Sequence, residues 1–376
     1  MTDRPKVFHF ITRLLKGGAE AKTIATVFGL DDYAFTVGHG RAFDREQITR
    51  LEGNGVATEC FPLVRHYNPA TALPAVASLA RYLRREQFDI VHTHSTEAGI
   101  IGRFAAVAAG IPHVVHTVHG VPFTEDRNPL LNRFVLGCER KAATYTDRIV
   151  TNADVIAEAY LDRGIGTRDQ YTTIYSGVEL EAFRAATPAT DLPGQRPRVV
   201  MIGRLAEGKG FEIMLEAAEQ ICDDDATVLL VGEGPLFDDL DAEITARGLE
   251  ADVFMTGYRD DVPNVLAASD VLALPSFREG TPRVITEAMA SGLPVVATDI
   301  AGVPEQVEDG ENGYLIPTGD ADALAERLST LLADRQLREK MGDRGRERAS
   351  RFSVEQMCAD IGRLYEGLLD APPDAG

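Results

Sequence analysis

The sequence predicts an α/β protein of two doubly wound domains, each with a parallel sheet covered by helices on both faces. Short apolar runs rich in β-branched residues alternate with helical patterns along the chain of 376 residues. Apolar strands that are separated by helices are typical of parallel sheets buried on both sides. The length also exceeds what one ordinary hydrophobic core accommodates, so we expect two domains.

The strand-like runs follow one another with helical patterns between them, such as 72–85 and 130–144. In the first half they are Val7–Ile11, Ala34–Val37, Ala57–Phe61, Ile90–His92, His113–Thr117 and Arg148–Thr151. In the second half they are Val199–Ile202, Val228–Val231, Val253–Thr256, Val271–Leu274 and Val295–Ala297.

Residues 185–197 separate the two halves, and their prolines, glycine and few apolar groups are typical of a linker. The sequence therefore predicts one domain at 1–185, a second at 186–350 and a C-terminal segment, 351–376, that carries a final helix.

Charge and cysteine usage limit the classes of partner and compartment. The formal net charge is −20, and all of it falls on residues 186–376. This acidity argues against nucleic-acid binding, which needs a basic face, and it suggests an organism with an acidic proteome. The four cysteines are scattered and read as reduced thiols. With no signal peptide and no long apolar stretch, we expect a cytoplasmic protein.

Two glutamates eight positions apart, Glu279 and Glu287, lie in a segment that reads as strand, loop and helix. Gly280, Thr281 and Pro282 open the predicted helix, and proline suits a first helical turn. Both carboxylates can reach one pocket, where they would suit the hydroxyl groups of a sugar. The alternative is a solvated helix face, on which glutamate pairs are common. The flanking strands, glycine and proline favour the pocket.

A second segment combines two cations with a glycine-spaced loop. Gly203 follows a predicted strand, and Arg204 and Lys209 lie on the loop that leads into the next helix. Both side chains can converge on one diphosphate, to which the helix N-terminus adds partial positive charge. A surface salt-bridge pair is the alternative. The position at a βα turn, where open sheets bind ligands, favours the diphosphate.

Three other loops follow predicted strands. Gly17 and Gly18 open a helix and could bind phosphate or let an acceptor approach, although an ordinary tight turn would look the same. No G-K-[ST] follows them, so this is not a P-loop. Gly234 lies in a V-G-E-G-P loop that lacks the third glycine of a dinucleotide fingerprint. Tyr258 ends the following strand.

All eight histidines fall between His9 and His119, several of them at strand ends. Such an arrangement could form a metal site. Carboxylates at ligand spacing and zinc-type cysteines are missing nearby, so we expect no metal. Most of the histidines read as core or rim residues, and His119 is singled out below.

These motifs resemble, in the expected order and over nearly the whole chain, those of retaining GT-B glycosyltransferases of family 4 (glycosyl transferases group 1). The pair Glu279 and Glu287 matches the family's E-x7-E motif, and His119 lies in a T-x-H-G segment. The loops at Gly17 and Gly234 match the GGxE and V-G-x-G-P segments. The resemblance implies the GT-B architecture, two Rossmann-like domains that face a cleft, with the final helix, 353–369, crossing back onto the first domain.

The resemblance also implies a role for each matching residue. Arg204 and Lys209 would neutralise the leaving nucleoside diphosphate, Glu279 and His119 would contact the transferred sugar, and Glu287 would hold the ribose. The implied catalytic residues are His119, Arg204, Lys209 and Glu279. The implied substrate-binding residues are Gly17, Gly18, Gly203, Gly234, Tyr258, Gly280, Thr281, Pro282 and Glu287. Many members have an aromatic residue where this chain has Thr281, which leaves the donor sugar unassigned.

The expected activity is a retaining, metal-independent transfer of class EC 2.4, in polysaccharide or glycolipid biosynthesis. The donor would be a UDP-, GDP- or ADP-sugar, the acceptor a glycan or lipid-linked hydroxyl, with no further cofactor. Residues 71–85 form an apolar helix with a basic end, which would suit peripheral contact with the inner face of the cell membrane. A core helix is the alternative. Two other classes stay open: a sugar-nucleotide epimerase of the same architecture, and a non-catalytic nucleotide-sugar binder.

Overall fold

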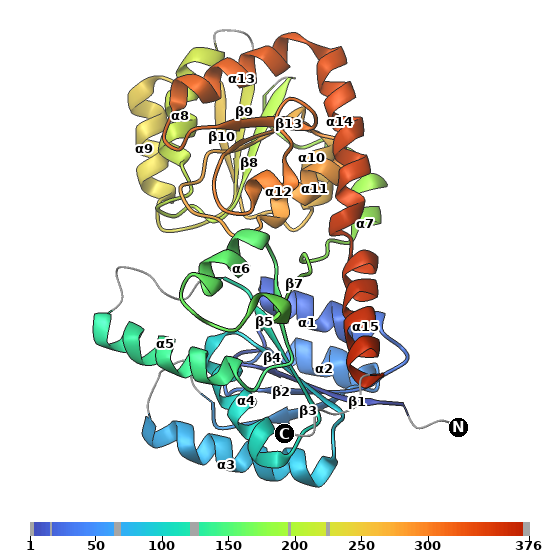
Figure 1. The fold of residues 1–376 in the computed structure, drawn as a ribbon. Helices are drawn as coiled ribbons and strands as arrows, with labels where there is room; N and C mark the ends of the chain where they lie inside the picture. The colour runs from blue at the N-terminus through green and yellow to red at the C-terminus, as the bar shows by residue number, and fades with distance from the viewer. Residues whose placement is uncertain are drawn as a thin grey trace. The chain divides into compact units, whose positions relative to one another are not determined.

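The computed structural model describes residues 4–15, 17–63, 69–120, 128–194, 197–222 and 226–370. The chain forms two compact units, shown as a ribbon in Figure 1. Unit 1 comprises Met1–Gly177 and Val354–Gly376, and unit 2 comprises Val178–Ser353. Each unit has one parallel sheet with helices packed around it, which confirms the predicted fold class.

Unit 1 contains a seven-stranded sheet in the order β3-β2-β1-β4-β5-β6-β7, and every neighbouring pair is parallel. Its strands are β1 (Lys6–Ile11), β2 (Ala34–His39), β3 (Ala57–Cys60), β4 (Ile90–His94), β5 (His113–Val118), β6 (Arg148–Thr151) and β7 (Tyr171–Thr173). The sequence predicts all of these except β7, which is too short and too polar to show a pattern.

The helices of unit 1 include one from the far end of the chain. They are α1 (Gly18–Gly29), α2 (Arg45–Gly53), α3 (Pro69–Glu86), α4 (Thr96–Ala109), α5 (Pro129–Ala143), α6 (Asp154–Leu161), the 3₁₀ turn η1 (Arg168–Gln170) and α15 (Val354–Leu369). Helix α15 buries Met357, Ile361 and Tyr365 in one cluster with Val7 and Ile90 of the sheet. These three residues recur at helical spacing, so one apolar stripe of α15 completes the core.

Unit 2 contains a six-stranded parallel sheet in the order β10-β9-β8-β11-β12-β13. Its strands are β8 (Arg198–Ile202), β9 (Thr227–Val231), β10 (Val253–Gly257), β11 (Val271–Leu274), β12 (Val295–Thr298) and β13 (Gly313–Ile316). The first five are predicted and β13 is not. In both sheets the strand order reverses beside the first strand, and such a switch point is where open α/β sheets bind ligands.

The helices of unit 2 pack against its sheet, and one apolar core cluster takes alternate strand residues, such as Val199, Met201 and Ala273, from one sheet face. The helices are α7 (Leu180–Arg184), α8 (Phe211–Ile221), α9 (Phe237–Arg247), α10 (Val262–Ala267), α11 (Arg283–Ser291), α12 (Val303–Gln306), α13 (Ala321–Ala333), α14 (Arg335–Ala349) and the 3₁₀ turn η3 (Ser350–Phe352).

The division between the units differs from the expected one at 185/186. It falls between Gly177 and Val178. The described part of the proline-rich stretch lies on unit 2, where the Ala189 N–H donates to the Asn264 carbonyl at 2.9 Å. Arg259 forms an ion pair with Asp191 in the same stretch. Proline-rich composition marks a loop, but tertiary contacts decide whether that loop lies between domains.

Helix α3 covers the segment that the sequence offers as a membrane contact. Its Ala75, Leu79 and Leu83 are buried in the core of unit 1, so this apolar face belongs to the interior, as the core-helix alternative holds. Leu73, near its start, is exposed. Of the helices that the structure describes, none combines the length and the apolar character needed to span a bilayer.

Candidate functional site

The predicted donor-site residues of unit 2 follow the carboxyl ends of neighbouring strands. Gly203 and Arg204 follow β8, Gly234 follows β9, Tyr258 follows β10, and Glu279 lies on the loop after β11. Because the strands are parallel, their carboxyl ends lie along the same edge of the sheet, perpendicular to the strands. The loops of Lys209 and Glu279 therefore flank the switch point between β8 and β11.

Lys209 and Glu279 meet at this edge. The Lys209 Nζ lies 2.7 Å from Glu279 Oε1, and the side chains are 34% and 12% exposed. Ser276 Oγ donates to the same carboxylate oxygen at 2.9 Å. Ser276 is itself buried, and its carbonyl accepts a hydrogen bond from Thr298 Oγ1 at 2.6 Å. The Lys209–Glu279 pair thus places one positive and one negative group at the carboxyl ends of β8 and β11.

Sequence reasoning missed Ser276. Its signal is a hydroxyl directly after an apolar strand and three residues before Glu279. The structure shows that this serine anchors the carboxylate through the contact at 2.9 Å.

Glu287 lies on the second turn of α11 and is largely buried, with 16% of its side chain exposed. Burial raises the pKa of its carboxyl group, and the nearby Arg283 guanidinium opposes that rise. Pro282 is the N-cap of α11 and not its first helical residue, because the helix begins at Arg283. The extended ψ of 119° at Pro282 turns the chain into the helix. At Gly280 an added Cβ would meet no atom within 4 Å, so this loop borders open space.

Glycines allow the loop after β9 to pack closely against the loop after β8. A Cβ on Gly232 would lie 2.0 Å from the Gly203 carbonyl oxygen, and one on Gly234 would lie 2.2 Å from that of Leu205. Gly232 also has a φ of +143°, which side chains rarely adopt. These glycines therefore serve close packing of backbone on backbone, which positions the Arg204 loop.

Arg204 and Tyr258 are exposed at the same edge, Tyr258 by 71%. Within the part of the chain that the structure describes, Arg204 forms no ion pair. Arg204 is therefore not part of a surface salt bridge, as the alternative interpretation held, whereas Lys209 forms an ion pair with Glu279. The neighbouring Arg259 forms ion pairs with Asp191 and Asp261 instead.

In unit 1, the Gly17–Gly18 loop opens α1 directly after β1. Gly17 is the N-cap, and a Cβ there would lie 2.6 Å from Glu20 Oε2. At Gly18 an added Cβ would meet nothing within 4 Å. One turn further along, buried Lys22 donates from Nζ to the Ile174 carbonyl at 2.6 Å. Burial lowers the pKa of Lys22 to about 7, opposed by Asp360.

His119 joins a cluster of histidines that the sequence did not predict. His119 Nε2 lies 3.3 Å from His94 Nδ1, and His94 Nε2 lies 2.8 Å from His9 Nδ1. Strand register explains the cluster, because His9 pairs with His92 across β1 and β4. Burial lowers the pKa of His9 and of the partly exposed His119 to about 3, and Lys22 adds to the effect on His119. These imidazoles are therefore neutral at physiological pH.

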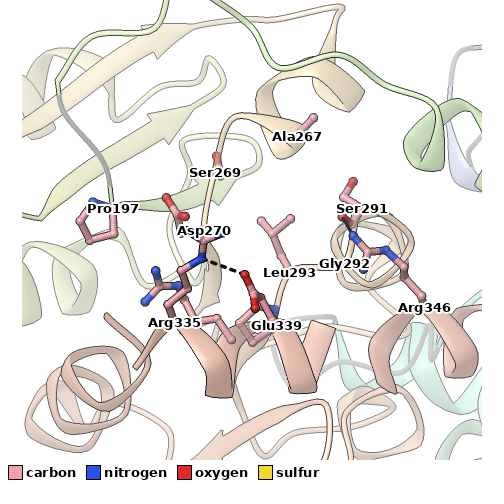
Figure 2. A pocket seen from close by; sticks show the side chains of 12 residues that line it. Pro197, Ala267, Ser269, Asp270, Ser291, Gly292, Leu293, Arg335, Glu339 and Arg346 are labelled. Carbon is pink, nitrogen blue, oxygen red and sulfur yellow. Dashed lines mark hydrogen bonds and ion pairs between the residues drawn. The ribbon is translucent and has the colours of Figure 1, made fainter. Parts of the chain in front are cut away.

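A separate hollow of about 480 Å³ lies at the opposite edge of the unit 2 sheet. Figure 2 shows Pro197 and Asp270, which directly precede β8 and β11, among the residues that line it. Its arginines are already engaged: Arg335 pairs with Glu339 at 2.8 Å, and Arg346 donates to the Ser291 carbonyl at 3.1 Å. We read this hollow as a surface feature away from the site at the carboxyl ends.

Comparison with known proteins shows the family and the fold of the chain. Residues 9–177 match the model of the glycosyl transferase 4-like domain, and residues 183–348 match that of glycosyl transferases group 1. The chain is 35% identical over 292 residues to UDP-Gal:alpha-D-GlcNAc-diphosphoundecaprenol alpha-1,3-galactosyltransferase of Escherichia coli. That match covers 73% of this chain and 74% of the relative. The chain belongs to the glycosyltransferases.

Other relatives and solved structures support the same family and fold. A D-inositol 3-phosphate glycosyltransferase of Saccharomonospora viridis is 29% identical over 308 residues, covering 76% of this chain and 71% of the relative. The crystal structure of Anabaena HepE in complex with UDP matches with a TM-score of 0.81 and 26% identity, covering 96% of this chain and 100% of that one. The expected GT-B architecture and the resemblance to GT-B glycosyltransferases are confirmed.

Proposed function

We propose that this glycosyltransferase moves a sugar from a UDP-sugar to a hydroxyl of a lipid-linked or glycan acceptor, with retention of anomeric configuration and without a metal ion. The Lys209–Glu279 pair at the switch point of unit 2 carries the proposal. UDP is favoured over GDP and ADP because the Escherichia coli relative is named for UDP-Gal and HepE was crystallised with UDP.

Cations beside the departing diphosphate are the first part of the mechanism. When the bond between the sugar and the diphosphate breaks, negative charge grows on the leaving phosphate, and preorganised cations lower the energy of that state. The ammonium of Lys209 has three N–H donors, so it can keep one on Glu279 and direct the others to phosphate. Arg204 is exposed beside it and presents a planar fork. Together they supply the positive charge that a metal ion supplies in other enzymes.

Two carboxylates orient the donor in this proposal. Glu279, with one oxygen held by Lys209 and Ser276, accepts hydrogen bonds from sugar hydroxyls. Glu287 accepts hydrogen bonds from the two ribose hydroxyls, which would restore the charged form that burial disfavours. Gly280, Thr281 and Pro282 border the sugar, Gly203 and Gly234 border the diphosphate, and Tyr258 lies by the base.

Unit 1 supplies the acceptor side. His119 is neutral and partly exposed, so it can exchange a hydrogen bond with a hydroxyl of the transferred sugar. The Gly17–Gly18 loop would admit the acceptor, since nothing lies within 4 Å of a Cβ on Gly18.

A lipid-linked acceptor would bring unit 1 to the cytoplasmic face of a membrane. The Escherichia coli relative is named for a diphosphoundecaprenol acceptor. Helix α3 buries its apolar face, but α5 exposes Leu130 by 79% and Phe134 by 51%, one turn apart. Arg133 and Lys141 on the same helix would face anionic headgroups. Flotation with anionic vesicles that is lost in Leu130→Ser/Phe134→Ser would support this contact, and no flotation of the native chain would refute it.

Product analysis tests the activity. The chain is incubated with UDP-galactose, UDP-glucose, UDP-N-acetylglucosamine, GDP-mannose or ADP-glucose, and with a diphosphate-linked N-acetylglucosamine lipid. We expect acceptor-dependent release of UDP, an α-linked product by NMR, and no loss of rate in EDTA. A β-linked product would refute retention, and loss of rate in EDTA would refute metal independence.

The same reactions separate the two alternatives. An isomerised donor without acceptor use would indicate the epimerase. Donor binding by calorimetry without any turnover would indicate the non-catalytic binder.

A further inference from the structure

Six side chains of unit 1 form one continuous run of hydrogen-bond contacts, here called the histidine chain. In order, its members are Thr117, His92, Tyr365, His9, His94 and His119. They come from β1, β4, β5, the loop after β5 and the C-terminal helix α15. The first five are buried, and His119 at the end keeps partial exposure.

Each link joins named atoms. His92 Nε2 lies 2.6 Å from Thr117 Oγ1, and His92 Nδ1 lies 2.6 Å from the Tyr365 hydroxyl. The Tyr365 hydroxyl lies 3.1 Å from His9 Nε2. His9 Nδ1 lies 2.8 Å from His94 Nε2, and His94 Nδ1 lies 3.3 Å from His119 Nε2. Every histidine therefore uses both ring nitrogens except His119, whose Nδ1 ends the chain.

The chain has a direction because its histidines are neutral. Burial lowers the pKa of all four, and the charge of Lys22 lowers those of His92 and His119 further. A neutral imidazole donates from one nitrogen and accepts at the other, and a tyrosine hydroxyl has one proton. Among the described residues the buried Tyr365 hydroxyl has only His92 and His9 as hydrogen-bond partners, so its proton must go to one of these two imidazoles. If one link reverses, every other link therefore reverses too. All four histidines consequently carry the proton on Nδ1, or all four carry it on Nε2.

Thr117 decides between these two arrangements. Its side chain is fully buried, and among the residues that the structure describes the only hydrogen-bond partner of its Oγ1 is His92 Nε2. If His92 donated to Thr117, the threonine proton would be left without an acceptor in the interior, which is costly. Thr117 therefore donates to His92, and the direction runs from Thr117 towards His119.

We propose that the histidine chain sets the tautomer of His119, so that its Nδ1–H is a hydrogen-bond donor. Tyr365, His94, His9, His92 and Thr117 are then positioning residues that act through His119. This inference rests on the proposed function for the identity of the acceptor atom, a hydroxyl oxygen of the transferred sugar. It goes beyond that function because it assigns a role to the C-terminal helix, which supplies Tyr365.

A metal ion is the competing interpretation of the same cluster. The ligand atoms of His9, His92 and His94 lie within 4.8 Å of one another. The two nitrogens of His9 and His94 are 2.8 Å apart, a hydrogen-bond distance, whereas nitrogens around a tetrahedral zinc ion are about 3.3 Å apart. Hydrogen bonds describe the cluster better.

Nitrogen NMR of the full chain, labelled with ¹⁵N-histidine, tests the proposal without donor or acceptor. The four resonances are assigned from single His→Gln variants at pH 7. We expect all four histidines as the neutral Nδ1–H tautomer, unchanged by added Zn²⁺. An Nε2–H tautomer or an imidazolium at any of the four, or a zinc-dependent shift of His9, would overturn it.

Matched variants separate positioning from structure. Tyr365→Phe removes the central link, and Thr117→Val removes the first donor while Thr117→Ser keeps it. Tyr33→Phe is the control, because the Tyr33 ring lies 5.3 Å from that of Tyr365 but outside the chain. In Tyr365→Phe and Thr117→Val we expect mixed tautomers at His119 and a kcat about tenfold lower with a similar KM. Thr117→Ser and Tyr33→Phe should behave as the native chain.

The outcomes distinguish this inference from the proposed function. Retention of both tautomer and kcat in folded Tyr365→Phe and Thr117→Val proteins would overturn the histidine chain. A uniform Nδ1–H tautomer in a protein without transferase activity would support the chain and refute the proposed function.

Discussion

Removal of Lys209 should weaken diphosphate binding in a way that depends on Glu279. In Lys209→Met, the diphosphate loses one charge-assisted contact, which contributes about 1.5–3 kcal/mol. That loss corresponds to a rise in Kd for UDP of about 10- to 150-fold. The variant also leaves the Glu279 carboxylate, only 12% exposed, without its cation and beside the incoming phosphates.

The loss of the Lys209–Glu279 ion pair is the second effect, and its energy can be estimated from the distance between the two charges. Two unit charges 2.7 Å apart, as in this pair, interact by about 1.5 kcal/mol in water and by about 6 kcal/mol at an effective dielectric constant of 20. Because Lys209 is 34% exposed, solvent screening places the coupling towards the lower figure. We therefore expect Lys209→Met/Glu279→Gln to recover about 1 kcal/mol of binding, roughly a fivefold lower Kd than Lys209→Met alone.

Isothermal titration of UDP into the native chain, both single variants and the double variant measures this cycle. Glu279→Gln alone should bind UDP at least as tightly as the native chain while it loses transfer activity. Lys340→Met, on the exposed surface of α14, is the matched control for loss of a lysine charge in unit 2. A Kd for folded Lys209→Met within twofold of the native value would refute the assignment of Lys209. Strictly additive single effects would refute the coupling.

Three further outcomes follow from the structure. Burial raises the pKa of Glu287, and the proposed contact with the ribose needs its ionised form, so UDP affinity should fall as the pH drops from 7.5 to 5; titrations of Glu287→Gln should show a flatter pH dependence. Arg103 and Glu139 form an ion pair with both side chains fully buried, so Glu139→Ala should lower the free energy of unfolding by about 3–5 kcal/mol in urea. Arg103→Met/Glu139→Leu should recover most of that loss, and equal losses in both proteins would contradict this account. Gly232→Ala should destabilise unit 2 by about 2 kcal/mol and weaken UDP binding, because its Cβ would lie 2.0 Å from a backbone oxygen. Gly248→Ala, at a positive φ with open space around it, is the control and should cost less.

The sequence predicts the buried strands of both sheets but not the two short strands β7 and β13. Buried strands such as β1 and β11 are runs of apolar residues, so the sequence reveals them. Strand β7 is three residues of tyrosine and threonine at a sheet edge, and β13 begins with Gly313 after a turn-like sequence. Their pairing depends on a neighbour already in place, which no local pattern records.

The sequence predicts the loops of the candidate site but not the contacts between their side chains. The loops of Arg204, Lys209 and Glu279 are recognisable because glycines and charged residues follow buried strands. Lys209 donates to Glu279 Oε1 at 2.7 Å, and Ser276 donates to the same oxygen. The contact between Lys209 and Glu279 joins two loops that are 70 residues apart in the chain, so no local pattern predicts it. The local sequence contains the groups, and the sheet order brings the loops to one edge.

The sequence by itself determined the alternation of strands and helices, the family resemblance and the charged loops, because each depends on residues close together in the chain. Tertiary structure alone decided that the division between units lies at Gly177 and that the apolar face of α3 is buried. It also joined His9 to His94 and Tyr365, which are 85 and 356 positions away. Such contacts depend on strand register and helix docking, which arise from packing over the whole core.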